Sequence, residues 1–215
     1  MTEPKMTKSR LLPMIALMLG CIAVVVCYYF IDRPVAWFCY QHRFYSDEFL
    51  LWPTLISDWL TDIVILGMAV VVAWRFWRPG GPLQTLLFSI AVNLAATAGI
   101  KTVLKGAFGR TWPRDWLRSQ VGQLAHEVYG FHPFRFDQGY HSFPSGHAAS
   151  TFAVISMLWI ARPKWRWLYA AVGGLMCVAL VGMNYHFVGD VIGGGVLGSV
   201  TGICATRIFH LRPER

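Results

Sequence analysis

Two short segments that lie far apart in the chain carry the residue types needed for acid and base chemistry. One runs from Ser142 to His147 (Ser-Phe-Pro-Ser-Gly-His) and the other from His186 to Asp190. A histidine that is hydrogen-bonded to a carboxylate one helical turn away is a prepared nucleophile or base. A second histidine behind Pro-Ser-Gly supplies a proton donor beside free backbone N–H groups. We therefore expect the two segments to act together on an anion.

The separation of the two histidines predicts that they meet. His147 and His186 are 39 residues apart, and each crossing of a bilayer needs about 20 apolar residues. Two crossings return the chain to the side that it left. We therefore expect both histidines on one face of a membrane.

The composition is that of an integral membrane protein. Of the 215 residues, 55% are hydrophobic and only 14% are charged, with a mean hydropathy of +0.46, which is outside the usual range of soluble domains. Charge-poor runs predict six transmembrane helices. They run from Leu11 to Phe30, Trp59 to Trp74, Pro82 to Ile100, His147 to Ile160, Trp167 to Tyr185 and Val191 to Thr206. The second is the weakest of the six, because Asp58 and Asp62 leave it a short uncharged stretch.

No repeat, low-complexity tract or linker divides the chain, so we expect an all-α bundle of six transmembrane helices that forms a single domain over residues 1–215. The outer connection between the third and fourth helices, from about Gly106 to Phe143, is long and rich in Arg, His, Phe and Trp. It is predicted to be an ordered lid or a cap that contacts the substrate. Glycines at positions 194, 198 and 202 favour close packing of the last helix within the chain over a dimer interface.

Lysines and arginines predict the orientation of the helices. If the N-terminus is cytoplasmic, every inner segment is basic and almost free of acidic residues. Both termini are then cytoplasmic and the two histidines face outward. The net charge of +8 is divided between these topology signals and an outer cluster around the motifs, so we expect the lipid bilayer and no nucleic acid as a partner. The oligomeric state stays open.

Three motifs, taken together, carry a resemblance to a known family. They are Phe143 to His147, then His186-x3-Asp190, and upstream the stretch Lys105-x4-Arg110-x2-Pro113. In this order they resemble the signature of the type 2 phosphatidic acid phosphatase superfamily, over about Lys105 to Gly195. The resemblance implies a lipid phosphatase (a phosphoric ester or anhydride hydrolase) of the bacterial inner membrane, with its active site on the outer, periplasmic or extracytoplasmic, face. Compatible substrates are phosphatidic acid, phosphatidylglycerophosphate, an isoprenyl pyrophosphate and a lipid A phosphate.

The resemblance also implies roles for individual residues. His186 takes the position of the nucleophile that forms a phosphohistidine, and Asp190 orients it. His147 takes the position of the acid that protonates the leaving oxygen. The Ser145 hydroxyl and the Gly146 N–H are expected to hold non-bridging phosphate oxygens. The four-residue spacing of His186 and Asp190 agrees, because residues at i and i+4 lie on one helix face.

The chain departs from the family pattern at two arginines. The first motif of the family is usually Lys-x6-Arg-Pro, and counted from Lys105 the arginine position is Trp112. A Ser-Arg pair normally precedes the nucleophile, and here Ala179 and Leu180 stand in its place. We therefore expect Arg110 to be the principal guanidinium on the phosphate, with Lys105 beside it and Arg114 as a weaker candidate.

These departures leave two other functions open. One is a lipid phosphotransferase that passes a phosphoryl or phospho-headgroup unit to another lipid. The other is a non-catalytic membrane binder or transporter, although ionisable residues near one membrane edge are costly to keep without a use.

A metal site in the long outer loop is a further alternative. His126, His132 and His141 lie there with Glu127 and Asp137. Their spacing matches no standard ligand set. We therefore expect no metal and no other cofactor.

Overall fold

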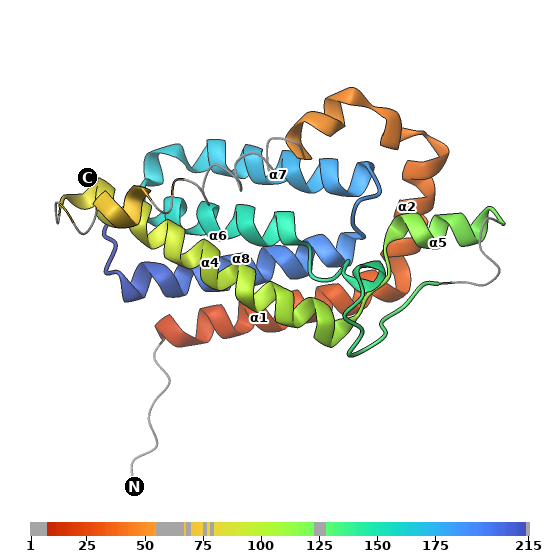
Figure 1. The fold of residues 1–215 in the computed structure, drawn as a ribbon, viewed down its shortest axis with the longest axis horizontal. Coiled ribbons are helices and arrows are strands. Elements are labelled where there is room, and N and C mark those ends of the chain that lie inside the picture. The colour runs from red at the N-terminus through yellow and green to blue at the C-terminus, as the bar shows by residue number, and fades with distance from the viewer. Residues whose placement is uncertain are drawn as a thin grey trace, which may run out of the picture.

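The described part of the chain is helical, and its main helices run side by side along the long axis of the molecule (Figure 1). The computed structural model describes residues 8–54, 67, 70–74, 77, 80–122 and 128–213. Helices suit the apolar runs because a bilayer offers backbone groups no water to bond with. The α-helices are α1 (Lys8–Val26), α2 (Asp32–Gln41), α4 (Pro82–Phe108), α5 (Pro113–Gln120), α6 (Gly146–Ala161), α7 (Arg166–Gly182) and α8 (Val188–Ile208). Shorter helical segments are η1 (Cys27–Ile31), η2 (Phe44–Ser46), η3 (Gln138–Tyr140) and η4 (Pro163–Trp165).

Four helical stretches in these ranges are long and apolar enough to cross a membrane, judged by length and composition. They are Met14–Gln41, Pro82–Phe108, Pro163–Gly182 and Val188–Ile208, and they correspond to the first, third, fifth and sixth predicted spans. The fourth predicted span forms the shorter apolar helix α6. The second, Trp59 to Trp74, lies largely outside the described residues. The all-α membrane architecture is thus confirmed, and the number of six spans stays a prediction.

The glycines of α8 let it lie directly against α6. A Cβ atom at Gly194 would clash with the backbone oxygen of Ser145, and one at Gly198 with that of Ala149. A Cβ atom at Gly202 would clash with α6 one turn further along. The prediction of close packing within the chain is therefore confirmed.

Helix α4 is two turns longer than predicted. The sequence interpretation ended this helix at Ile100, where the charge-poor run stops, but the helix continues to Phe108. Gly109 ends it with φ = 57° and donates its N–H to Lys105 O over 2.8 Å, as is usual for a glycine that terminates a helix. Lys101 and Lys105 therefore project from a rigid helix instead of a loop.

The ends of the helices are sorted along the bundle. The start of α1 and the end of α8 lie at one end, and α5 with the loop before α6 lies at the other (Figure 1). The beginnings of α6 and α8 are also joined there, because Ser145 N donates to Asp190 O over 3.0 Å. The two motifs identified in the sequence thus begin two packed helices.

Candidate active site

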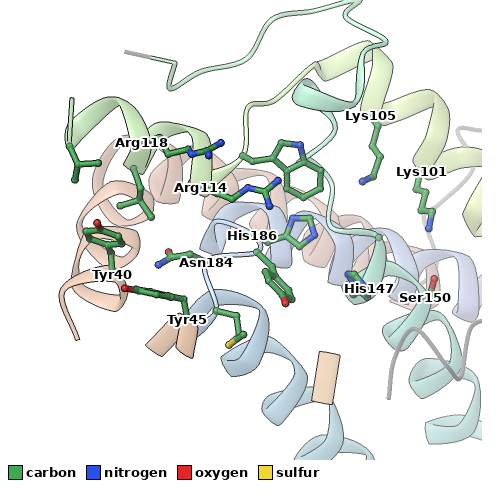
Figure 2. A pocket seen from close by; sticks show the side chains of 16 residues that line it. Tyr40, Tyr45, Lys101, Lys105, Arg114, Arg118, His147, Ser150, Asn184 and His186 are labelled. Atoms are coloured by element: carbon green, nitrogen blue, oxygen red, sulfur yellow. The ribbon is translucent and has the colours of Figure 1, made fainter. Parts of the chain in front are cut away.

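A pocket of about 910 Å³ opens at the end of the bundle where α6 and α8 begin. His147 and His186 line it, and so do four cationic side chains, Lys101, Lys105, Arg114 and Arg118 (Figure 2). The ring centroids of the two histidines are 6.2 Å apart. The structure therefore brings together the two histidines that the sequence analysis selected.

His186 is held by the carboxylate of Asp190. The imidazole is 3% exposed, and its Nδ1 lies 3.6 Å from Asp190 Oδ2 and 3.5 Å from Ser142 Oγ. Because Nδ1 faces these oxygens, Nε2 is the ring nitrogen left for a substrate. Ser142 also donates to Asp190 Oδ2 over 2.6 Å, so it orients the pair. The sequence interpretation gave Ser142 no role.

The other oxygen of Asp190 belongs to a buried ion-pair network. Asp190 Oδ1 accepts from Arg110 Nη1 over 2.6 Å, and Arg110 Nη2 donates to Asp32 Oδ2 over 2.5 Å. Both carboxylates and the guanidinium are at most 1% exposed. Asp32 Oδ1 in turn accepts from Gly189 N over 2.8 Å. The first span is therefore tied by charge to the first turn of α8.

Aromatic rings enclose the Arg110 guanidinium. The centroids of Tyr28, Tyr129, Phe131 and Phe187 lie 4.7 to 5.7 Å from its central carbon. Burial alone lowers the pKa of Arg110, but the Asp190 and Asp32 carboxylates outweigh it and raise that pKa above its ordinary value. Arg110 is therefore a permanent cation whose two arms are engaged.

This placement corrects the expectation for Arg110. We expected it to be the principal guanidinium on the phosphate, but the structure buries it completely and does not bring it to the pocket. The physical reason is that two carboxylates close by neutralise it more effectively than a partly hydrated substrate.

Lys101 and Lys105 form the basic wall of the pocket on α4. Lys105 Nζ donates to His141 O over 2.5 Å and lies 5.3 Å from the Trp112 ring centroid. Lys101 lies beside the start of α6, because its Nζ is 3.1 Å from the place of a Cβ atom at Gly146. The sequence analysis missed Lys101. Its four-residue spacing from Lys105 would have placed both on one face had the helix been extended past Ile100.

Trp112 stands where the family has an arginine, and it has a different role here. Its ring centroid lies 5.1 Å from that of His186, and its Nε1 donates to Gln138 O over 2.8 Å. The indole thus packs between the nucleophile candidate and the Lys105 ammonium. Stacking of this kind positions both groups without adding a charge.

The remaining predicted phosphate ligands divide into two groups. Gly146 and the exposed Arg114 line the pocket. Ser145 is fully buried and caps α6, because its Oγ accepts from Ala148 N over 3.4 Å. The structure therefore places Lys105, Gly146 and Arg114 at the pocket and Ser145 behind its wall.

Burial controls the charge of His186. Desolvation lowers the pKa of His186 below its ordinary value, and the Lys105 and His147 charges lower it further, while Asp190 opposes the shift. The imidazole is therefore neutral, as a nucleophile must be, down to a lower pH than a free histidine.

No group of three or more His, Cys, Asp or Glu side chains is placed to hold a metal ion in the ranges that the structure describes. Of the residues considered for a metal site, His126 and Glu127 lie outside those ranges. His132 instead packs against Tyr140, with ring centroids 5.0 Å apart. The expectation of a metal-free site stays a prediction.

Comparison with known proteins agrees with this architecture. No curated protein matches the sequence closely. A similar solved structure is described as the first transmembrane PAP2 type phosphatidylglycerolphosphate phosphatase from Bacillus subtilis. The two chains share 16% sequence identity and superimpose with a TM-score of 0.54. The match covers 92% of this chain and 96% of the Bacillus subtilis chain. The chain thus has the fold of a transmembrane phosphatase. A family model described as the PAP2 superfamily matches residues 86–214, which is more than half of the chain, and the protein belongs to that superfamily.

Proposed function

We propose that this protein hydrolyses a phosphate monoester or pyrophosphate of a membrane lipid through a phosphohistidine on His186. The observation that carries this proposal is the pairing of a buried histidine with Asp190 in a pocket that also holds His147 and four cations. A carboxylate that fixes the imidazole tautomer and directs the second nitrogen at a substrate is the arrangement that nucleophilic catalysis requires.

The proposed reaction has two steps. In the first, the Nε2 lone pair of His186 forms a bond to phosphorus while the bond from phosphorus to the leaving oxygen breaks, and that oxygen takes a proton from His147. In the second, His147 accepts a proton from a water molecule whose oxygen attacks phosphorus. The P–N bond then breaks, which releases phosphate and restores neutral His186.

The cations of the pocket support this chemistry. Phosphoryl transfer depends on positioning and on neutralising the equatorial oxygens. Lys101, Lys105 and Arg114 together with the Gly146 N–H supply that charge in the proposal, and we propose that no metal is needed. We expect phosphate release to persist when EDTA is added to the purified protein. Loss of activity that one divalent ion restores would contradict a metal-free mechanism.

The place of the pocket supports a lipid substrate. It opens at the ends of membrane-spanning helices, where the phosphate of an amphiphile lies. We propose a bacterial inner-membrane location with the pocket outside, and phosphatidic acid, phosphatidylglycerophosphate, an isoprenyl pyrophosphate or a lipid A phosphate as substrate.

Phosphate release from these four lipids by the purified protein in detergent tests the proposal. His186→Ala should abolish release, and acid-labile, base-stable phosphate should be trapped on the unsubstituted protein. A fully active His186→Ala protein would rule out the mechanism.

A phosphotransferase is the second candidate. Ala179 and Leu180, which stand in place of the family Ser-Arg pair, are fully buried and bring no charge to the site. The set of residues that can bind the phosphate therefore differs from the usual hydrolase pattern. Free phosphate formed with water as the sole acceptor favours hydrolysis, whereas product formed only when an acceptor lipid is present favours transfer.

A further inference from the structure

The pocket extends well beyond the space that one phosphate group needs. In Figure 2 the side chains around His186 lie on two sides of it. His147, Lys101 and Lys105 lie on one side, which we call the catalytic lobe. Tyr40, Tyr45, Arg118 and Asn184 lie on the other, which we call the distal lobe, and Arg114 lies between His186 and Arg118.

Two unpaired guanidinium groups lead from the catalytic lobe to the distal lobe. Arg114 and Arg118 are one turn apart on α5, so they share a face and are offset by about 6 Å along its axis. Both are exposed, and neither forms an ion pair with an acidic side chain that the structure describes. In the proposed function, Lys101, Lys105 and Arg114 serve the reacting phosphate. Arg118 lies beyond Arg114 as seen from His186 (Figure 2), so this further cation points to a second anion.

Asn184 gives an independent indication of a ligand. Its side chain lines the pocket and is only 6% exposed. Neither its amide nitrogen nor its amide oxygen has a hydrogen-bond partner among the described residues. Its φ of 53° explains why asparagine is tolerated in this turn, but it does not satisfy the amide. Buried polar groups without partners are rare in folded proteins, and this one adjoins a cationic pocket.

The far end of the distal lobe is aromatic. The Tyr40 and Tyr45 rings are stacked with centroids 5.8 Å apart, and both line the pocket. Their rings give an apolar wall, and a hydroxyl group is a donor to phosphate oxygens. Guanidinium, amide and phenol groups together are suited to a phosphate group and its ester oxygens.

We propose that the distal lobe binds a second phosphate group on the leaving-group side of the substrate, so that lipids with two phosphate groups are preferred over phosphatidic acid. This inference rests on the proposed function and specifies its substrate class. The second phosphate is joined to the first through one bridging oxygen in a lipid pyrophosphate and is separated from it by a glycerol unit in phosphatidylglycerophosphate. Both place a negative charge next to Arg118, while the terminal phosphate faces His186 and is held by Lys101, Lys105 and Arg114.

The first experiment measures kcat/KM for phosphatidic acid, a lipid pyrophosphate and phosphatidylglycerophosphate with matched chains in detergent. We expect at least one lipid with two phosphates to exceed phosphatidic acid about tenfold or more, the effect of one charged hydrogen bond. The favoured lipid identifies the source of the second phosphate.

Arg118→Gln and Asn184→Ala should each lower the ratio of kcat/KM for that lipid to kcat/KM for phosphatidic acid about tenfold, mainly through KM. Arg43→Gln, an exposed cation that does not line the pocket, is the matched control and should leave the ratio unchanged. A ratio that Arg118→Gln does not alter, or phosphatidic acid as the best substrate, would overturn the inference.

A second experiment separates this inference from the proposed function. In the His186→Ala protein, we expect either methylenediphosphonate or glycerol 1,3-bisphosphate, whose two phosphate groups have the two proposed spacings, to bind about tenfold more tightly than methylphosphonate. Arg118→Gln should remove the difference. Equal binding of all three probes would refute the distal lobe even if the protein is an active phosphatase. Tighter binding of either of the first two probes without turnover of any lipid would support the lobe and contradict the enzymatic proposal.

Discussion

Arg110 and Arg114 are four residues apart in the sequence, and they have opposite surroundings. Arg110 is completely buried and is paired with Asp32 and Asp190. Arg114 is exposed and lines the pocket without an acidic partner in the described part of the chain. Their difference shows that a guanidinium near a phosphate-binding motif is available to a substrate only when no carboxylate of the protein reaches it first.

The same contrast divides the two sides of the nucleophile candidate. Behind His186, a buried network holds two carboxylates and one guanidinium, so its formal charge is −1. In front of it, the cations of the pocket are not balanced by acidic side chains that the structure describes. We expect substitutions behind His186 to act on folding and orientation, and those in front of it to act on turnover.

Asp190 joins the two sides, and its substitution should have the largest effect. Asp190→Asn keeps a side chain of the same shape and leaves Arg110 paired with Asp32, so the protein should fold. The imidazole of His186 loses its orienting anion, and turnover should fall about 10⁴-fold, as for other orienting carboxylates. Phosphate release and a thermal unfolding curve in detergent measure both effects. Turnover within tenfold of the unsubstituted protein would show that Asp190 serves the buried network alone.

Arg110→Ala should act through stability. It leaves the Asp32 and Asp190 carboxylates buried without their cation, and breaking a buried ion pair in this way costs about 3–5 kcal/mol of the free energy of unfolding. The melting temperature in detergent and the yield of monodisperse protein measure this loss. Arg110→Lys should recover little of it, because an ammonium lacks the two-armed fork.

Asp32→Asn is the matched control for Arg110→Ala. Here the Arg110 and Asp190 charges still balance, so we expect a smaller loss of stability, about 1.5–3 kcal/mol for the charged hydrogen bond. An Arg110→Ala protein as stable as the unsubstituted one would contradict the comparison of the two arginines.

Arg114→Ala should show the reverse behaviour. The side chain is exposed, so the melting temperature should stay within the error of the measurement. Removing one preorganised donor to the transition state lowers the rate about 10²-fold to 10³-fold. A normal rate for Arg114→Ala with a strongly reduced rate for Lys101→Ala would assign the phosphate to the α4 wall alone.

The smallest expected effect concerns pH. Because the pKa of His186 is lowered, its neutral form persists below the ordinary histidine value of about 6.5. The acid limb of the profile of kcat/KM against pH should therefore lie below that value.

The same lowered pKa affects stability. In the unfolded chain the imidazole takes up its proton at a higher pH, so this group destabilises the fold as pH falls through about 6.5 and has no effect above it.

Lys105→Met tests the electrostatic cause of the lowered pKa. Lys105 is one of the charges that lower the pKa of His186, so its removal should move the acid limb to higher pH, by less than about one unit. A shift to lower pH would mean that the limb does not report His186.

The sequence predicted the helices correctly where residues that are close in sequence determine the structure. Apolar runs identified the four stretches that the structure also forms as long helices, and the glycine spacing predicted the packing of α8. The predicted end of α4 was wrong by two turns, because hydropathy ends a span at the first charged residue. The helix itself continues to Phe108 and ends at the glycine at position 109.

The partners within the site were harder to predict. His147, His186 and Asp190 were selected from short motifs, and the structure gathers them. Asp32 and Arg110 are 78 residues apart, and no periodicity links a carboxylate in one span to a guanidinium beyond another. Ser145 was assigned to phosphate by resemblance, yet its local sequence also suits a helix cap, and only tertiary packing distinguishes the two roles.

We expect the pairing of Asp32 with Arg110 to affect the order in which the protein assembles in the membrane. The ribosome makes Asp32 78 residues before Arg110, so the first span enters the bilayer while its carboxylate has no guanidinium partner. A charged side chain at the centre of a membrane is costly, but Asp32 follows the end of the predicted first span, Leu11 to Phe30, by two residues, where water is near. We therefore expect the first helix to stay near the interface at first and to reach its final position only after the third predicted span has crossed the membrane.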